Sequence, residues 1–128
     1  MKTSELTGVA LDWAVAKCKG FNPKQVNLAY TGITLVVGIS MDIGEGEEVW
    51  TPSTSWAQGG PIIEREVIVL THPKHDCWTA TAQDSTDLDV PLYQEDGLTP
   101  LIAAMRCYVA SKLGDEVEIP EEINREHS

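Results

Sequence analysis

Residues 99–114 read Thr99-Pro-Leu-Ile-Ala-Ala-Met-Arg-Cys-Tyr-Val-Ala-Ser-Lys-Leu-Gly114, and this stretch decides the fold. Thr99 is a good N-cap, Pro100 suits the first helical position, and Gly114 suits the residue just past the end. These signals predict a helix over residues 100–113. Its apolar residues recur at three- and four-residue spacing, which indicates a face turned toward a core: Leu101, Ile102, Met105, Tyr108, Val109 and Leu113.

A second helix is predicted near the N-terminus. Ser4 or Thr7 can cap its start, and Gly20 can close its end. The body of this helix carries few charges, so we expect neighbouring elements to cover most of it; the charged residues are Asp12, Lys17 and Lys19.

Between the two helices the apolar residues recur at every second position, which is typical of strands. The alternation changes phase at Thr31-Gly32, which predicts a hairpin or a bulged strand there. We expect further strands at 62–70, 77–82 and 90–93, and loops at 40–61 and 83–89. The elements together predict an α+β fold, in which a small antiparallel sheet carries the N-terminal and C-terminal helices on one face.

The length and the charge of the chain limit its domain organisation and the kinds of partner that it can bind. The 128 residues suit one domain, which we place at 1–114, followed by an acidic tail at 115–128. The formal net charge of −11 opposes direct binding to a nucleic-acid backbone or an anionic membrane. We interpret the tail as a solvated, solubilising segment, with a lure for a basic partner as the alternative.

The cysteines and the N-terminus indicate the compartment. Cys18, Cys77 and Cys107 are an odd set without a short repeating spacing, which disfavours a disulfide framework. The start of the chain lacks the apolar core of a signal peptide, and no apolar run approaches the ~18 residues that span a bilayer. We therefore expect a cytoplasmic protein.

Three blocks of the sequence resemble a known family. They are Leu6-Thr-Gly-Val-Ala-Leu-Asp-Trp-Ala-Val-Ala-Lys-Cys18, Pro52-Ser-Thr-Ser-Trp-Ala-Gln-Gly-Gly-Pro-Ile-Ile-Glu-Arg-Glu66 and the stretch 97–114 that contains the C-terminal helix. These three segments are similar in sequence to NinX-like proteins of lambdoid phages and prophages. The resemblance implies a phage accessory protein that acts in the bacterial cytoplasm, and it transfers no catalytic residues.

The segment Trp56-Ala-Gln-Gly-Gly-Pro61 is the main candidate for a ligand site. Gly59 and Gly60 would let the backbone come close to a ligand or present successive N–H groups to an anion. Trp56 would offer a flat stacking face, and Gln58 would bind polar edges. This chemistry suits a nucleotide-type ligand. The alternative is a Gly-Gly turn held by a packed tryptophan.

Arg65 and Arg106 complete the candidate site, since a guanidinium at the rim of a cavity would bind phosphate. Arg106 follows Ile102 by four residues and so lies beside the apolar face of its helix. The alternative is structural ion pairing, for example with Glu64, Glu66 or Asp12.

Two other constellations are weaker. His72, His75 and Cys77 are all zinc-ligand types, but their spacing matches no standard site, so we predict no metal and no cofactor. Neither that group nor the carboxylates of Glu64 and Glu66 completes a catalytic arrangement, and we therefore expect no catalytic residues.

The functional hypothesis that follows is a non-enzymatic binding protein. We expect it to sequester a host-made ligand, in particular a nucleotide-type signal of a bacterial defence system, through Trp56, Gln58, Gly59, Gly60, Arg65 and Arg106. The first alternative is an acidic module that blocks the basic surface of a host protein. The second is a hydrolase of a small nucleotide. Direct nucleic-acid binding and membrane association are not expected.

Overall fold

The computed structural model describes residues 1–28, 32–41, 44–83 and 92–123. These ranges form an α+β fold with helices and two antiparallel three-stranded sheets. The helical elements are η1 (Thr3–Glu5, a 3-10 helix), α1 (Gly8–Cys18), α2 (Trp56–Arg65) and α3 (Pro100–Leu113). The strands are β1 (Lys24–Leu28), β2 (Gly32–Met41), β3 (Gly44–Val49), β4 (Val69–Lys74), β5 (Cys77–Gln83) and β6 (Leu92–Gly97).

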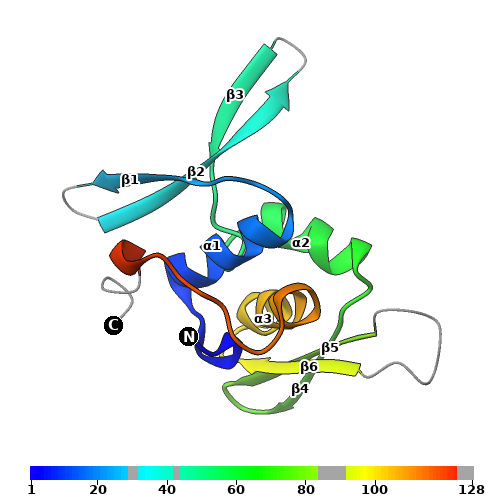
Figure 1. Cartoon of the computed structure of the whole chain (residues 1–128). Coiled ribbons are helices and arrows are strands. Elements are labelled where there is room, and N and C mark those ends of the chain that lie inside the picture. The colour runs from blue at the N-terminus through cyan, green and yellow to red at the C-terminus, as the bar shows by residue number, and fades with distance from the viewer. Residues whose placement is uncertain (29–31, 42–43, 84–91, 124–128) are drawn as a thin grey trace.

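Helix α3 is the centre of the molecule. The sheet β4-β5-β6 covers one side of it, and α1 and α2 cover the other (Figure 1). A helix enclosed in this way needs apolar residues almost all round, and α3 buries eight of its fourteen residues. Four of these eight are small, which lets the neighbouring backbones approach closely: Ala103, Ala104, Cys107 and Ala110.

The start of α3 confirms the prediction from its cap residues. The hydroxyl oxygen of Thr99 accepts a hydrogen bond from the backbone N–H of Ile102 at 3.1 Å, and Pro100 occupies the first turn. Gly97 at the end of β6 lies so close to α3 that an added Cβ would come within 2.6 Å of the Ala103 nitrogen. The turn between β6 and α3 is therefore tight, and it sets the helix on the sheet.

The second sheet has β2 as its middle strand. β1 pairs with the first half of β2 and β3 with the second half, so that Val36 faces both Lys24 and Val49. The two halves extend away from the helices in different directions (Figure 1). The predicted hairpin is confirmed, with residues 29–31 of its turn outside the described ranges.

The chain after β3 docks onto α1. Trp50 is buried, and its indole N–H donates to the Asp12 carbonyl oxygen at 2.9 Å. The Phe21 ring meets the Trp50 ring edge-on, with 5.2 Å between centroids. The backbone N–H of Ser53 donates to Asp12 Oδ1 at 2.8 Å. These contacts fix the second sheet and the start of α2 relative to α1.

Three predictions about this part of the chain were wrong. Residues 40–61 are not a loop, because they contain β3 and the first half of α2. Residues 62–70 are not one strand, because α2 continues to Arg65 and β4 begins only at Val69. The strands form two sheets, and α1 packs on α3 instead of beside it on one sheet face. The strand at 77–82 is confirmed as β5, while β6 begins near the predicted edge strand but extends to Gly97.

The prediction of a solvated tail was wrong for residues 115–123. Backbone hydrogen bonds join them to the N-terminus: Thr3 N–H to Asp115 O at 2.8 Å and Val117 N–H to Met1 O at 2.9 Å. The side chains of Val117 and Ile123 are buried in the core. The acidic residues between them face solvent while the apolar ones anchor the segment. Residues 124–128 lie outside the described ranges.

Candidate functional site

The segment Trp56–Pro61 forms the first turns of α2 and is not a ligand loop. The Gly59 N–H donates to the Ser55 carbonyl at 2.8 Å, as a helix requires, so it is not presented to an anion. The Gln58 amide is also engaged: its Nε2 donates to the Val49 carbonyl at 2.6 Å, and its Oε1 accepts from the Thr51 N–H at 2.6 Å. Gln58 therefore joins α2 to the end of β3.

The two glycines of α2 have different surroundings. A Cβ on Gly59 would lie 2.6 Å from both the Leu101 side chain and the Pro52 carbonyl oxygen, whereas a Cβ on Gly60 would meet nothing within 4 Å. Gly59 is thus required for the close approach of α2 to α3. Gly60 has no such packing requirement.

Trp56 and Arg65 lie at opposite ends of α2. Trp56 is 54% exposed at the start of the helix, and Arg65 is exposed in its last turn. Nine residues of α-helix separate them by about 14 Å along the axis and by about half a turn around it. The tryptophan is not the packed residue that the alternative interpretation required, and its ring does not face the guanidinium.

Arg106 lies on another side of α3 and binds backbone carbonyls. Its Nε donates to the Leu6 oxygen and its Nη1 to the Asp96 oxygen, each at 2.8 Å. It lines a cleft of about 310 Å³ together with Ser4, Gln94, Glu95 and Asp96. The predicted position at the rim of a cavity is thus observed, but the cavity contains none of the other five candidate residues.

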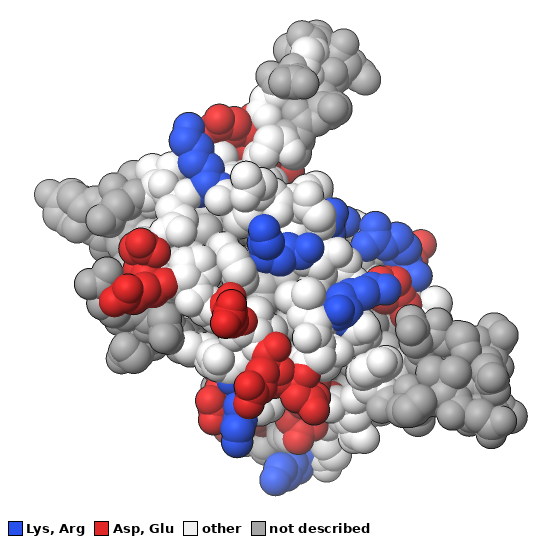
Figure 2. Space-filling model, viewed as in Figure 1, with Lys and Arg blue, Asp and Glu red and all other residues white. Residues whose placement is uncertain are grey.

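Two carboxylates line this cleft and others lie on the neighbouring segments; we call the whole group the acidic face. It comprises Glu95 and Asp96 on β6, Glu5 on η1, and Asp115 and Glu116, which the backbone bonds to residues 1–3 hold next to η1. Figure 2 shows Asp and Glu side chains gathered over the chain that follows α3 and the region below it. Burial raises the pKa of Glu95; the Arg106 charge opposes this, and the Asp115 and Asp96 charges add to it.

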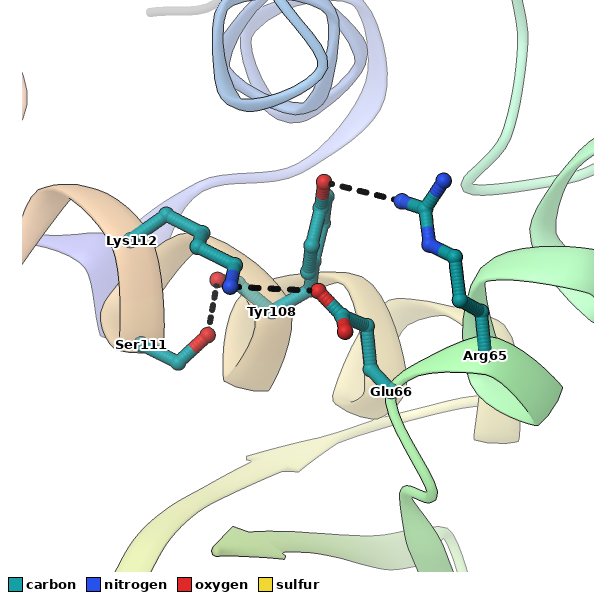
Figure 3. Close-up of polar contacts among 5 residues, drawn as sticks. All are labelled: Arg65, Glu66, Tyr108, Ser111 and Lys112. Carbon is teal, nitrogen blue, oxygen red and sulfur yellow. Dashed lines mark hydrogen bonds and ion pairs between the residues drawn. The ribbon is translucent and has the colours of Figure 1, made fainter. Parts of the chain in front are cut away.

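Basic side chains gather elsewhere, where the C-terminal ends of α1, α2 and α3 meet (Figure 2). Arg65 Nη2 donates to the Tyr108 hydroxyl at 3.4 Å, and Lys112 Nζ pairs with Glu66 Oε1 at 3.3 Å (Figure 3). Burial and, after it, the Arg65 charge lower the pKa of Lys19 at the end of α1, and the Glu66 charge opposes them. We call Lys19, Arg65, Glu66, Tyr108 and Lys112 the helix-end cluster. Of these residues, sequence analysis had put only Arg65 in its candidate site.

Among the described histidines, His72 packs against an aromatic ring, whereas His75 lies exposed on a turn. The His72 ring stacks on Trp78 with 4.4 Å between centroids, and His75 lies 3.5 Å from Asp76 at the β4–β5 turn. All three cysteines are free thiols, and burial raises the pKa of Cys18 to about 12 and that of Cys107 to about 11. Both thiols therefore stay protonated at neutral pH and are poor nucleophiles.

Comparison with protein families gives one match. The model of the family described as Bacteriophage P22, NinX matches residues 2–112, which is most of the chain. The chain belongs to this family. A comparison with curated proteins finds no match.

The NinX match covers the whole helix-end cluster and most of the acidic face. The match spans α1, α2 and α3 without interruption. It includes the stretches between the three sequence blocks that resemble the family. Asp115 and Glu116 lie beyond it. Among the helices of the described ranges, none is long and apolar enough to cross a membrane.

Proposed function

We propose that this NinX-family protein is a non-enzymatic phage accessory protein that acts in the bacterial cytoplasm by binding a basic surface of a host protein. The acidic face is the contact surface, and occupation of the host surface is the activity. The observation that carries the proposal is a group of carboxylates at or near one cleft. Glu95 and Asp96 line it, and the Asp115 charge acts on Glu95, while Glu5 follows the lining residue Ser4 and Glu116 is bridged to Lys2.

The structure of this face supports a role in binding. Carboxylates on flexible segments would move apart. Here backbone hydrogen bonds between residues 1–3 and 115–117 hold Asp115 and Glu116 beside the N-terminal segment. Like charges held in place raise the free energy of the unbound protein. A basic partner relieves that repulsion, and the long-range attraction also speeds encounter.

The nucleotide hypothesis has less support from the geometry. Its six residues do not form one site. Trp56 and Arg65 lie at the two ends of α2, and Gln58, Gly59 and Gly60 lie between them, while Arg106 lies on the far side of α3. The hydrolase alternative needs a metal-ligand set or an acid/base pair, and no observation favours one.

Affinity capture from a lysate of host cells tests the proposal. The acidic-face variant carries Glu5→Gln, Glu95→Gln, Asp115→Asn and Glu116→Gln, and the control variant neutralises four other exposed or half-exposed carboxylates, Glu47, Glu64, Asp76 and Glu121. Both variants change the net charge by the same amount. We expect a basic host protein to be retained by the parent and by the control variant and lost from the acidic-face variant.

Equal retention by the acidic-face variant and the control would contradict the proposal, because net charge alone would then explain the binding. Capture of a partner that is not basic would contradict it as well.

A further inference from the structure

We propose that the helix-end cluster is a binding site for a phosphate-type dianion, with Lys19, Arg65 and Lys112 supplying positive charge and Tyr108 supplying a hydrogen-bond donor. The site is separate from the acidic face and does not depend on the proposed protein-binding function. It lies where the ends of α1, α2 and α3 converge (Figures 2 and 3).

The charge balance of the cluster is the first argument. Lys19, Arg65 and Lys112 carry three positive charges, and Glu66, which contacts Lys112, carries one negative charge. The local excess of about two positive charges occurs in a chain whose net charge is −11. The partial negative charges at the C-terminal ends of the three helices reduce this excess, and a phosphate-type anion would neutralise what remains.

The unpaired cations are the second argument. Among the described residues, Lys112 forms an ion pair with Glu66, whereas neither Lys19 nor Arg65 forms one. Burial and, after it, the Arg65 charge disfavour the charged form of Lys19. The Glu66 charge and the Phe21 ring, 5.6 Å from Lys19 Nζ, offset only part of this repulsion, and an anion between the two cations would remove the rest.

Tyr108 is the third argument. Its side chain is only 2% exposed, yet its hydroxyl reaches the Arg65 guanidinium, from which it accepts a hydrogen bond. The hydroxyl proton has no acceptor among the described residues. Burial, more than any nearby charge, raises the pKa of Tyr108, so the phenol keeps this proton at neutral pH. A buried donor without an acceptor, beside a guanidinium, suits an anionic oxygen.

Stabilisation of the helix dipoles is the simpler explanation of these cations. Lys112 and Arg65 lie in the last turns of their helices, where a positive charge is favourable by about 0.3–1 kcal/mol. That effect accounts for each cation separately. It does not account for the like charge of Arg65 that acts on Lys19. Nor does it account for the Tyr108 hydroxyl proton, which has no acceptor among the described residues.

Binding of inorganic phosphate and of adenosine monophosphate to the full chain, measured by isothermal titration calorimetry at low ionic strength, tests the inference. We expect saturable binding of both probes and no heat from sodium chloride at matched ionic strength. Arg65→Gln and Lys19→Gln should each raise the Kd roughly tenfold, because each removes one charged contact. Tyr108→Phe should raise it a few-fold.

Lys17→Gln is the matched control, since Lys17 is exposed on the same helix as Lys19 and lies 5.8 Å over the Trp13 ring. It should leave the Kd unchanged. Tighter binding of the nucleotide than of phosphate would identify a nucleotide as the source of the anion, and equal binding would identify free phosphate. Phosphate that behaves like chloride, or equal losses in Lys17→Gln and Arg65→Gln, would overturn the inference.

Discussion

At the scale of single residues, Asp12 shows how a charge serves the packing of this fold. It lies in the middle of α1 and is only 4% exposed, and its carboxylate accepts the Ser53 N–H while its carbonyl accepts the Trp50 indole. Burial raises the pKa of this carboxyl from 3.8 to about 6, and the Ser53 hydrogen bond only partly opposes that effect. The Asp12 carboxylate therefore orients the segment after β3. Its removal from water costs free energy.

Asp12 should therefore make stability depend on pH. The folded protein binds the Asp12 proton more tightly than the unfolded chain does, so protonation stabilises the fold. This stabilisation is complete below about pH 4 and is lost as the pH rises through about 6, with a total change of about 3 kcal/mol. Urea unfolding of the parent and of Asp12→Asn between pH 4 and 7 measures it. The difference between the two proteins should change by that amount, and parallel curves would contradict the assignment.

Gly59 and Gly60 form a natural pair for a second residue-scale prediction. Gly59→Ala should destabilise the protein by about 1–3 kcal/mol, because its Cβ would overlap the Pro52 carbonyl oxygen and Leu101. Gly60→Ala should stabilise it by about 0.5–1 kcal/mol, because the helix gains a better former and nothing lies within 4 Å of the new methyl group. Thermal or urea unfolding of both variants checks this. The same sign for both would mean that α2 does not pack as described.

At the scale of elements, local signals predicted α3 and failed for α2. The ends of α3 are encoded by residues that act within one turn, Thr99, Pro100 and Gly114, so the sequence shows them directly. Gly59, Gly60 and Pro61 are poor helix formers, yet they lie inside α2. Packing of Gly59 against α3 and burial of Ile62 outweigh local propensity there. No local pattern reports such tertiary contacts.

The candidate site, like the helices, was only partly predictable from the sequence. Arg65 and Arg106 were predicted to share one ligand site, and the sequence does not show that they lie on different sides of α3. Lys19 and Lys112 were missed. Both lie at the ends of predicted helices, and only the convergence of those ends in space brings them together with Arg65.

The segment after α3 supports a prediction at this scale. Ile123 is fully buried, so Ile123→Ala should destabilise the protein by about 2–5 kcal/mol. Truncation after Glu118 should cost a similar amount, because it removes the same side chain. The control is Glu122→Ala at the adjacent exposed position, which should change stability by less than about 0.5 kcal/mol. An unchanged melting temperature after truncation would show that the segment does not pack.

At the scale of the whole molecule, the distribution of charge matters more than its total. The composition predicted a strongly acidic protein, and part of that charge was expected on a solvated C-terminal tail. The structure instead joins the first part of that segment to the N-terminus, next to the carboxylates of β6 (Figures 1 and 2). The cations gather at the helix ends. The protein thus has one face suited to a basic partner and one suited to an anion.

The central claim is that the acidic face binds a basic protein surface, and the salt dependence of affinity tests it most directly. The Kd of the captured partner would be measured at several ionic strengths for the parent, the acidic-face variant and the control variant. For the parent, the Kd should rise steeply with salt, because the contact is electrostatic and the Debye length falls from about 10 Å at 0.1 M to about 3 Å at 1 M. The acidic-face variant should bind more weakly and with a flatter salt dependence, and the control should follow the parent. A Kd that is insensitive to salt, or equal salt dependence in the two variants, would contradict the claim.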